Sequence, residues 1–243
     1  MKINVLDNII FDKKQIISGV TKVNKDIFPE TGISFNLNDH RGIFNFNEHL
    51  GYLANAINFN ESRIKYVDQV HSDIIVEMSG TSEVCKADAM ITTEKNLILM
   101  IRTADCAGIL IYDSTNEVIA AVHSGWKGTQ LNITGKTLTQ MINRYGCNPD
   151  DLLIYISPCA SGRNYEVGED VAQFFPNSIT KLSANKFLFD NTKEILEQIS
   201  VYGIPMQNIE IANVCSIENK DFHSYRRDGV NAGRMGVFIG MID

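Results

Sequence analysis

The sequence has no apolar run long enough to cross a membrane. A spanning helix needs roughly 20 mainly apolar residues, and no segment of this 243-residue chain approaches that length. The first residues, MKINVLDNIIFDKK, place acidic side chains where a signal peptide would have its apolar core. We therefore expect a cytoplasmic protein with no membrane partner.

Basic residues are also scarce. Lys and Arg number 22 against 29 Asp and Glu, which gives a net charge of −7 and a pI near 5.3. Binding to nucleic acid depends on clustered Lys and Arg that contact phosphates. The composition therefore argues against nucleic acid as a partner.

The cysteines lack the spacing of a disulfide framework or of a structural zinc finger. They lie at positions 85, 106, 147, 159 and 215, which is an odd number with no CxxC pair. A free cysteine is usually a small buried hydrophobe. A functional role for Cys106 therefore needs further evidence.

Apolar segments fill much of the chain. Hydrophobic residues make up 44% of it, and no Pro/Gly/Ser linker divides it, which predicts a single domain over residues 1–243. Continuous apolar runs predict buried strands at 87–93, 96–103, 107–113 and 118–125. Such runs are typical of a sheet covered on both faces. The segment 131–146 has helical spacing, and Gly146 would end that helix. We predict an α/β fold with a mixed sheet covered by helices.

Three side chains that can bind a metal lie at or beside predicted strands. His71 lies within IKYVDQVHSDIIVEM, residues 64–78, whose alternation predicts a strand or a bent strand pair with Gln69 and His71 on one face. Cys106 and His123 lie at the ends of later apolar strands. Because a sheet brings strand ends to one rim, these side chains can form a His/Cys/His cluster.

This cluster has three interpretations. Zinc accepts imidazole and thiolate ligands, and a catalytic site keeps three protein ligands and an open position. Alternatively, Cys106 is the nucleophile of a thiol hydrolase, with His71 or His123 as its base. The third interpretation is a buried cysteine beside two hydrogen-bonded histidines. The spacing matches no compact zinc signature and does not decide between them.

Several blocks of sequence together resemble one known family. In order they are QVHS, ADAMIT, RTADCAGILIYD, AVHSGWKGT, SPCASGRNYEVGEDV and FHSYRRDGVNAGRMG. They resemble the signature blocks of the YfiH/YlmD-like family, also called laccase-domain or polyphenol-oxidase-like, from about Gly32 to the C-terminus. The resemblance implies a YfiH-like fold with His71, Cys106 and His123 as zinc ligands.

The resemblance also implies an activity. Members are described as purine nucleoside enzymes that phosphorolyse adenosine, inosine and methylthioadenosine and deaminate adenosine, or as polyphenol oxidases or peptidoglycan-editing factors. The five histidines of this chain are too few for the copper sites of a multicopper oxidase, so copper is disfavoured as the cofactor. A lone blue-copper site would also need an axial ligand such as Met90 or Met100. Purine nucleosides and phosphate are therefore the expected partners, whereas the sequence does not indicate an oligomeric state.

Deamination requires a proton shuttle beside the metal. A zinc-bound water, whose pKa falls to about 7, would attack C6 of the purine while a carboxylate moves protons. Asp105 is the candidate because it precedes Cys106. However, neighbouring side chains on a strand point to opposite faces, so Asp105 reaches the metal only if the backbone bends. Otherwise it anchors a neighbouring loop.

Phosphorolysis requires a cationic group for phosphate. Lys127, beside a glycine turn at a helix start, and Arg226 are the candidates. The family more commonly has GWRG where this chain has Lys127, so a point charge replaces a bidentate fork. For the nucleoside we expect contacts from Asn36, Arg41 and Tyr165, and Trp126 could stack on the base.

Overall fold

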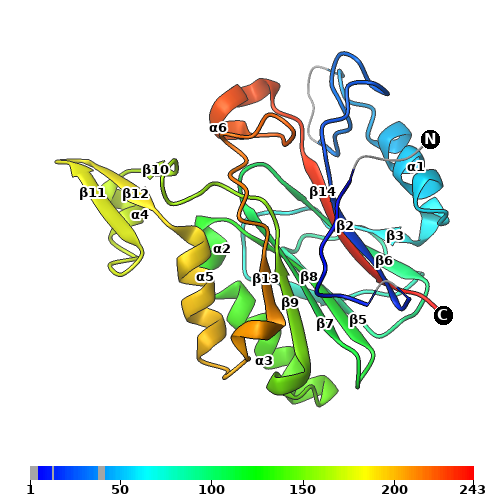
Figure 1. The fold of residues 1–243 in the computed structure, drawn as a ribbon. Helices are drawn as coiled ribbons and strands as arrows, with labels where there is room; N and C mark the ends of the chain where they lie inside the picture. The colour runs from blue at the N-terminus through cyan, green and yellow to red at the C-terminus, as the bar shows by residue number, and fades with distance from the viewer. Residues whose placement is uncertain (1–4, 13, 38–41) are drawn as a thin grey trace.

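The computed structural model describes residues 5–12, 14–37 and 42–243, and two facing β-sheets form its centre (Figure 1). The first sheet has five strands in the order β1-β2-β14-β6-β3. They are β1 Val5–Leu6, β2 Ile16–Thr21, β14 Met235–Met241, β6 Leu97–Thr103 and β3 Ile64–Lys65. β14 is antiparallel to both β2 and β6, and β3 is parallel to β6. The predicted strand at 96–103 is therefore an inner strand of this sheet.

The second sheet has six strands in the order β13-β9-β7-β8-β5-β4. They are β13 Ile209–Ile211, β9 Leu152–Ile156, β7 Ala107–Asp113, β8 Val118–Ser124, β5 Ala89–Thr92 and β4 Ile75–Glu77. Its two outer pairs are parallel and its inner pairs antiparallel. The sheet is mixed, as predicted.

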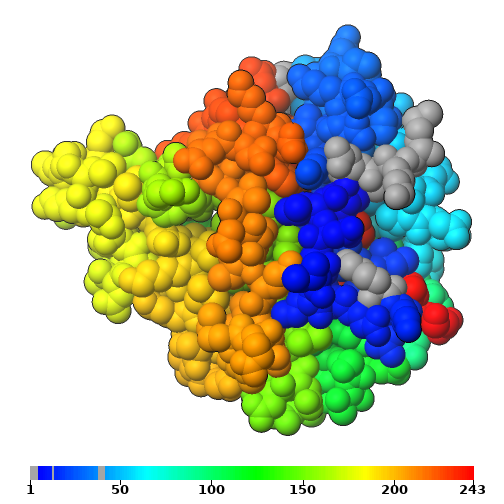
Figure 2. Space-filling model, in the orientation of Figure 1, coloured from blue at the N-terminus to red at the C-terminus, as the bar shows by residue number. Residues whose placement is uncertain are grey.

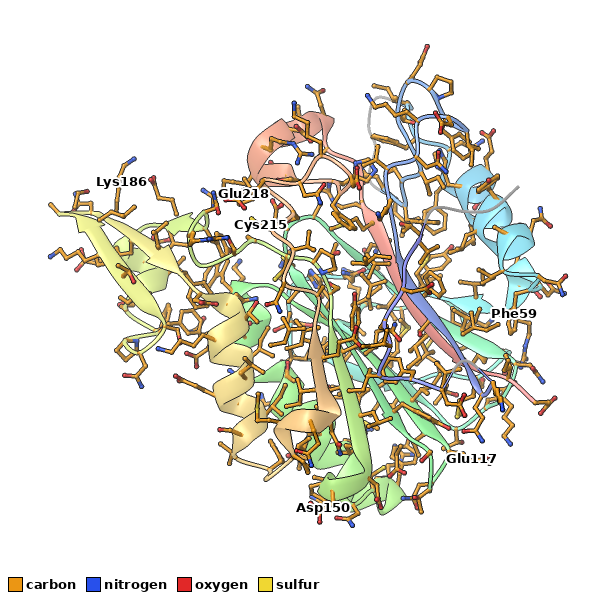
Figure 3. All side chains as sticks on the ribbon, viewed as in Figure 1. Phe59, Glu117, Asp150, Lys186, Cys215 and Glu218 are labelled. Carbon is orange, nitrogen blue, oxygen red and sulfur yellow. The ribbon has the colours of Figure 1, made fainter. Side chains whose placement is uncertain are left out.

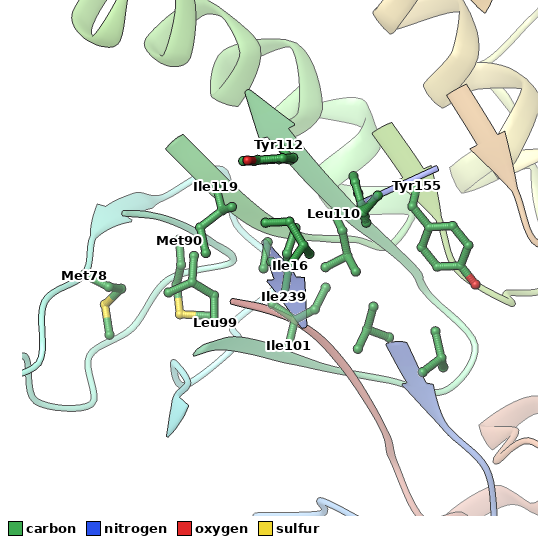
Figure 4. Close-up of a cluster of buried hydrophobic side chains, with 14 of the residues drawn as sticks. Ile16, Met78, Met90, Leu99, Ile101, Leu110, Tyr112, Ile119, Tyr155 and Ile239 are labelled. Atoms are coloured by element: carbon green, nitrogen blue, oxygen red, sulfur yellow. The ribbon is translucent and has the colours of Figure 1, made fainter. Parts of the chain in front are cut away.

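Alternate residues of each inner strand face two different hydrophobic cores. Leu99, Leu110, Ile119 and Ile239 face into the space between the two sheets (Figure 4). Their sequence neighbours point outwards and are covered by helices. A fully buried Leu or Ile side chain stabilises the fold by about 1.5–3 kcal/mol relative to an exposed one. This double burial explains the continuous apolar runs.

Helices cover the outer face of each sheet. α1 Phe46–Ala56 packs on the five-stranded sheet through Leu50 and Leu53. α3 Ile133–Tyr145 and α5 Asn191–Ser200 cover the six-stranded sheet, and α2 Trp126–Gln130 precedes α3. The α/β class and the helical covering are therefore confirmed. The structure adds a second facing sheet to this architecture, because an apolar strand face packs equally well against a helix or another sheet.

The predicted end of α3 is confirmed in detail. Gly146 caps the helix in the left-handed region at φ 72°, and its amide donates to carbonyls of the last turn. A residue with a Cβ is disfavoured in that region. The chain then enters β9, so β8, α3 and β9 form a strand–helix–strand unit, with β7 between the two strands.

A smaller sheet stands out from the body as an arm (Figures 1 and 2). It contains β10 Glu166–Val167, β12 Lys186–Phe189 and β11 Ile179–Ser183, with α4 Glu169–Ala172 beside it. In Figure 3, Lys186 lies towards the tip of this arm. α6 Tyr225–Asp228 lies between the arm and β14 in sequence and at the top of Figure 1. In the described part of the chain, every helix is too short or too polar to cross a membrane.

Candidate metal centre

Cys106 and His123 are brought together by the antiparallel pairing of β7 and β8. Gly108 pairs with His123, so Cys106, just before β7, lies beside the end of β8. Glu117, in the turn that joins the two strands, lies at the opposite end of the molecule from α6 (Figure 3). The site is therefore at the open ends of this strand pair.

His71 reaches the same place from a loop. Of the strand or bent strand pair predicted over 64–78, two short strands form, β3 ending at Lys65 and β4 beginning at Ile75. The placement of His71 on a strand was wrong, because His71 lies between them with a φ of 57°. The carboxylate of Asp88, just before β5, holds this loop. Its donors are the amides of Val70 at 3.3 Å, His71 at 3.0 Å and Ser72 at 2.6 Å, and the Ser72 hydroxyl at 2.7 Å.

The three side chains fit a metal ion. Their ligand atoms all lie within 4.8 Å of one another. His123 Nδ1 is 2.8 Å from Asp88 Oδ1, which leaves Nε2 for a metal and fixes the ring, as carboxylates do for metal-binding histidines. At Gly125, a Cβ would lie 2.6 Å from Cys106 Sγ and 3.2 Å from His71 Nδ1. The backbone there leaves room only for a hydrogen, so the cluster is closely packed.

The electrostatics of the cluster follow from Asp88 and Cys106. Burial by itself lowers the pKa of His123, but Cys106 and the Asp88 hydrogen bond outweigh it and raise the pKa to about 9. Burial raises the pKa of Asp88, yet the hydrogen bonds from His123 and Ser72 lower it to about 2. Desolvation and the neighbouring His123 lower the pKa of His71 to about 4, so this ring is neutral and able to bind a metal at neutral pH.

A cavity of about 620 Å³ opens directly over the cluster. Small-molecule sites typically have volumes of roughly 300–1,000 Å³. Besides the three ligand candidates, its walls include Trp126 and Tyr165 as aromatic surfaces. The cavity has the size and lining expected of a site for a nucleoside-sized molecule.

The other predicted residues fall in different places. Asn36, Tyr165 and Arg226 line the cavity, and the Arg226 guanidinium carbon lies 5.4 Å from the centre of the Tyr165 ring. Lys127 is exposed, with its ammonium 5.5 Å from the centre of the Trp126 ring. Arg41 lies outside the described residues.

Asp105 lines the cavity, but its carboxylate is engaged with neighbouring segments. Oδ1 accepts a hydrogen bond from Ser216 Oγ at 2.6 Å, and Oδ2 accepts one from the Arg226 amide at 2.8 Å. Its carbonyl also accepts from the Ala160 amide at 2.9 Å. Asp105 therefore fastens the start of α6 to the cavity wall, which is the anchoring role considered above.

Sequence reasoning missed two residues of the site, Asp88 and Arg234. Asp88 is fully buried, and the signal for it was a single carboxylate inside the apolar block ADAMIT. Arg234 lines the cavity just before β14, in the block GRMG. Both blocks were recognised, but neither side chain shows its partners in the sequence.

Comparisons with known proteins find relatives over most of the chain. Residues 19–242 match a family described as multi-copper polyphenol oxidoreductase laccase. A Clostridium acetobutylicum protein named purine nucleoside phosphorylase is 36% identical over 216 residues, covering 86% of this chain and 88% of that protein. A Corynebacterium glutamicum protein with the same enzyme name is 34% identical over 218 residues, covering 84% and 86%.

Solved structures share the fold. YlmD from Geobacillus stearothermophilus superposes with a TM-score of 0.86 at 23% identity, over 94% of this chain and 92% of that one. A Neisseria meningitidis protein gives a TM-score of 0.84 at 20% identity over the full length of both chains. With nearly the whole sequence matched and the same architecture found in its relatives, the chain belongs to the YfiH/YlmD-like, laccase-domain family.

Proposed function

We propose that this protein is a zinc-dependent purine nucleoside phosphorylase. The convergence of His71, Cys106 and His123 on one nucleoside-sized cavity carries the proposal. The enzyme name of its curated relatives supports it. The donor set of two imidazoles and a thiolate suits zinc.

Zinc is favoured over copper at this cluster. A blue-copper site needs a weak axial ligand such as methionine. Met90 and Met100, the candidates from the sequence, are buried in the hydrophobic cores between the sheets and beneath α1. When bound, zinc supplies a Lewis acid that polarises an oxygen or a nitrogen of the substrate.

The residues of the chain bind and orient the reactants. In phosphorolysis a phosphate oxygen forms a bond to C1′ of the ribose while the C1′–N9 bond breaks. Its electron pair goes to the purine, which takes up a proton, and the products are ribose 1-phosphate and the free base. Trp126 and Tyr165 offer flat surfaces for the base, and the arginines of the cavity offset the charge of phosphate.

Deamination of adenosine is a second activity that the same cavity supports. In this reaction water and adenosine give inosine and ammonia. Asp105 lines the cavity with Cys106, and a carboxylate has about four lone-pair sites, so its two side-chain hydrogen bonds leave acceptor capacity for a proton. Methylthioadenosine, which carries the same base, is a further substrate of this proposal.

Turnover and bound metal should be measured on the same sample. Adenosine, inosine and methylthioadenosine are incubated with and without phosphate, and base, ribose 1-phosphate and ammonia are quantified. We expect base release to require phosphate, ammonia to form from adenosine in either case, and about one zinc per chain. Zinc-loaded protein that converts none of the three would overturn the proposal and favour a binding or editing role. Protein with little zinc and a rapidly alkylated Cys106 would favour the thiol hydrolase.

A further inference from the structure

The cavity has more positive than negative charge in its walls. Three arginines line it, Arg102, Arg226 and Arg234, against the carboxylate of Asp105. Asp105 already accepts hydrogen bonds from Ser216 and Arg226. A surplus of cations in the walls of a cavity favours an anionic ligand.

The three arginines differ in how their donors are used. Arg102 is tied to the protein, because its Nε lies 3.2 Å from Gln69 Oε1 and its Nη2 donates to the Val67 carbonyl at 2.8 Å. Arg226 is exposed and lies over Tyr165. Arg234 combines a fixed position with donors that the protein does not use.

Arg234 is held from one side. Its Nη1 donates to the carbonyls of Ala232 at 3.0 Å and Gly233 at 2.8 Å, and its guanidinium carbon lies 5.6 Å from the centre of the Tyr225 ring. These contacts fix the plane of the guanidinium. The side chain therefore does not have to be ordered when a ligand arrives, which removes an entropic cost of binding.

The other edge of Arg234, a residue that lines the cavity, is not used by the protein. Within residues 5–12, 14–37 and 42–243, its Nε and Nη2 have no hydrogen-bond partner. These two nitrogens lie on the same edge of the guanidinium and donate in parallel, which matches two oxygens of a carboxylate or a phosphate. His71 and Cys106 are other walls of the same cavity. The unused edge is thus a preformed fork for an oxyanion beside the metal cluster.

We propose that Arg234, through its Nε and Nη2, forms the phosphate subsite of this protein. The choice of phosphate rests on the proposed function, in which inorganic phosphate is the second substrate. Arg234 takes this role in place of Lys127, whose exposed ammonium lies over Trp126. The tetrahedral oxyanion is held next to His71 and Cys106, where the ribose must also lie to react.

Phosphate binding by zinc-loaded protein, followed by phosphorus NMR without nucleoside, tests the subsite. The variants are Arg234→Gln, which removes the charge, and Arg234→Lys, which keeps the charge and removes the fork. Arg163→Gln is the matched control, because Arg163 is an exposed arginine whose side chain is 84% accessible. One charge-assisted hydrogen bond is worth roughly 10- to 100-fold in affinity, and Arg234→Gln keeps at most one of the two. We expect a loss of that size for Arg234→Gln, a smaller loss for Arg234→Lys, and none for Arg163→Gln.

Steady-state kinetics separate a phosphate subsite from a merely structural role. Arg234→Lys should raise the KM for phosphate about tenfold and change the KM for inosine by less than about twofold, because only one substrate loses a contact. Bound zinc and Tm should match the parent protein. If Arg234→Gln does not fold, Arg234→Lys carries the test alone.

Three outcomes would overturn the subsite or separate it from the proposed function. Unchanged phosphate affinity in both Arg234 variants excludes it. A loss of affinity for adenosine 5′-monophosphate with unchanged affinity for inorganic phosphate shows that Arg234 reads a phosphate ester instead. A parent protein that binds phosphate through Arg234 but converts no nucleoside keeps the subsite and overturns phosphorolysis.

Discussion

Two buried histidines of this protein have opposite electrostatics. His123 and His223 are 4% and 6% exposed, and each makes a hydrogen bond through its ring. His123 meets the carboxylate of Asp88 and the thiol of Cys106, whereas His223 Nε2 meets the Ile33 carbonyl at 2.7 Å. Burial lowers the pKa of His223 to about 4, but the negative neighbours of His123 raise its pKa to about 9.

This difference shows that the partner, and not burial, decides what a buried histidine does. A neutral carbonyl accepts a hydrogen bond from the ring of His223, and this histidine has a structural role. A buried carboxylate fixes the ring, raises its basicity and leaves the second nitrogen for a metal. Four predictions test this contrast.

The largest effect is expected for His123→Ala. The substitution removes one of three ligands, so we expect zinc affinity to fall by more than the roughly 100-fold cost of losing an outer-shell partner, and turnover to be abolished. Zinc quantification and the nucleoside assay measure both. His223→Gln is the matched control and should keep its zinc, because His223 is not one of the three ligand candidates. Equal zinc loss in the two variants would contradict the contrast.

Asp88→Asn makes the surroundings of His123 resemble those of His223. An amide cannot accept all of the hydrogen bonds that the carboxylate accepts, and it removes the charge that orients the ring. We expect zinc affinity to fall about 10- to 100-fold and the free energy of unfolding to fall by about 3–5 kcal/mol, as for a broken buried charge pair. Zinc titration and urea denaturation test this. Unchanged zinc affinity would show that the loop of His71 keeps its conformation without the Asp88 carboxylate.

Acid should destabilise the protein through His223. The pKa of this side chain is about 4 in the folded protein, against an ordinary value of 6.5, so the unfolded chain binds more protons between these values. The contribution of His223 to the free energy of unfolding is fully present above pH 6.5 and is lost as the pH falls towards 4. The loss is about 3 kcal/mol, at about 1.36 kcal/mol per pKa unit. Denaturation of His223→Gln should lack this part of the pH dependence. Parallel curves for parent and variant would refute it.

The smallest effect is expected for Asp105→Asn. The variant weakens the bonds from Ser216 and the Arg226 amide, so we expect the free energy of unfolding to fall by about 1–2 kcal/mol with full zinc retention. Ammonia release from adenosine should be lost if Asp105 moves protons, while base release in phosphate should persist. Loss of zinc would show that Asp105, like Asp88, helps to position the metal ligands.

The sequence predicted the parts of the fold that local patterns determine. Apolar runs identified the inner strands, and Gly146 identified the end of α3. The second sheet was missed, because an apolar strand face is the same whether a helix or a sheet covers it. The alternation around His71 predicts a strand or a bent strand pair, whereas the loop between the two strands is held by Asp88, a carboxylate distant in sequence that a local pattern does not reveal.

For the candidate site, the sequence predicted the metal-ligand candidates but not the partners of the surrounding side chains. The three ligand candidates converge as expected from strand ends and from the family resemblance. The roles of Lys127 and Asp105 depend on side-chain direction, which the sequence does not determine. Asp88 and Arg234 were missed because their importance lies in partners that only the folded chain brings to them.

The position of β14 has a consequence for biosynthesis. This strand is inserted between β2 and β6, although it is made after every other strand in the sequence. A ribosome-bound chain must therefore hold the edges of β2 and β6 open until β14 emerges, and exposed strand edges are prone to aggregate. Arg234 directly precedes β14 and reaches the cavity only with it. The wall of the cavity that contains Arg234 is therefore absent until β14 has taken its place.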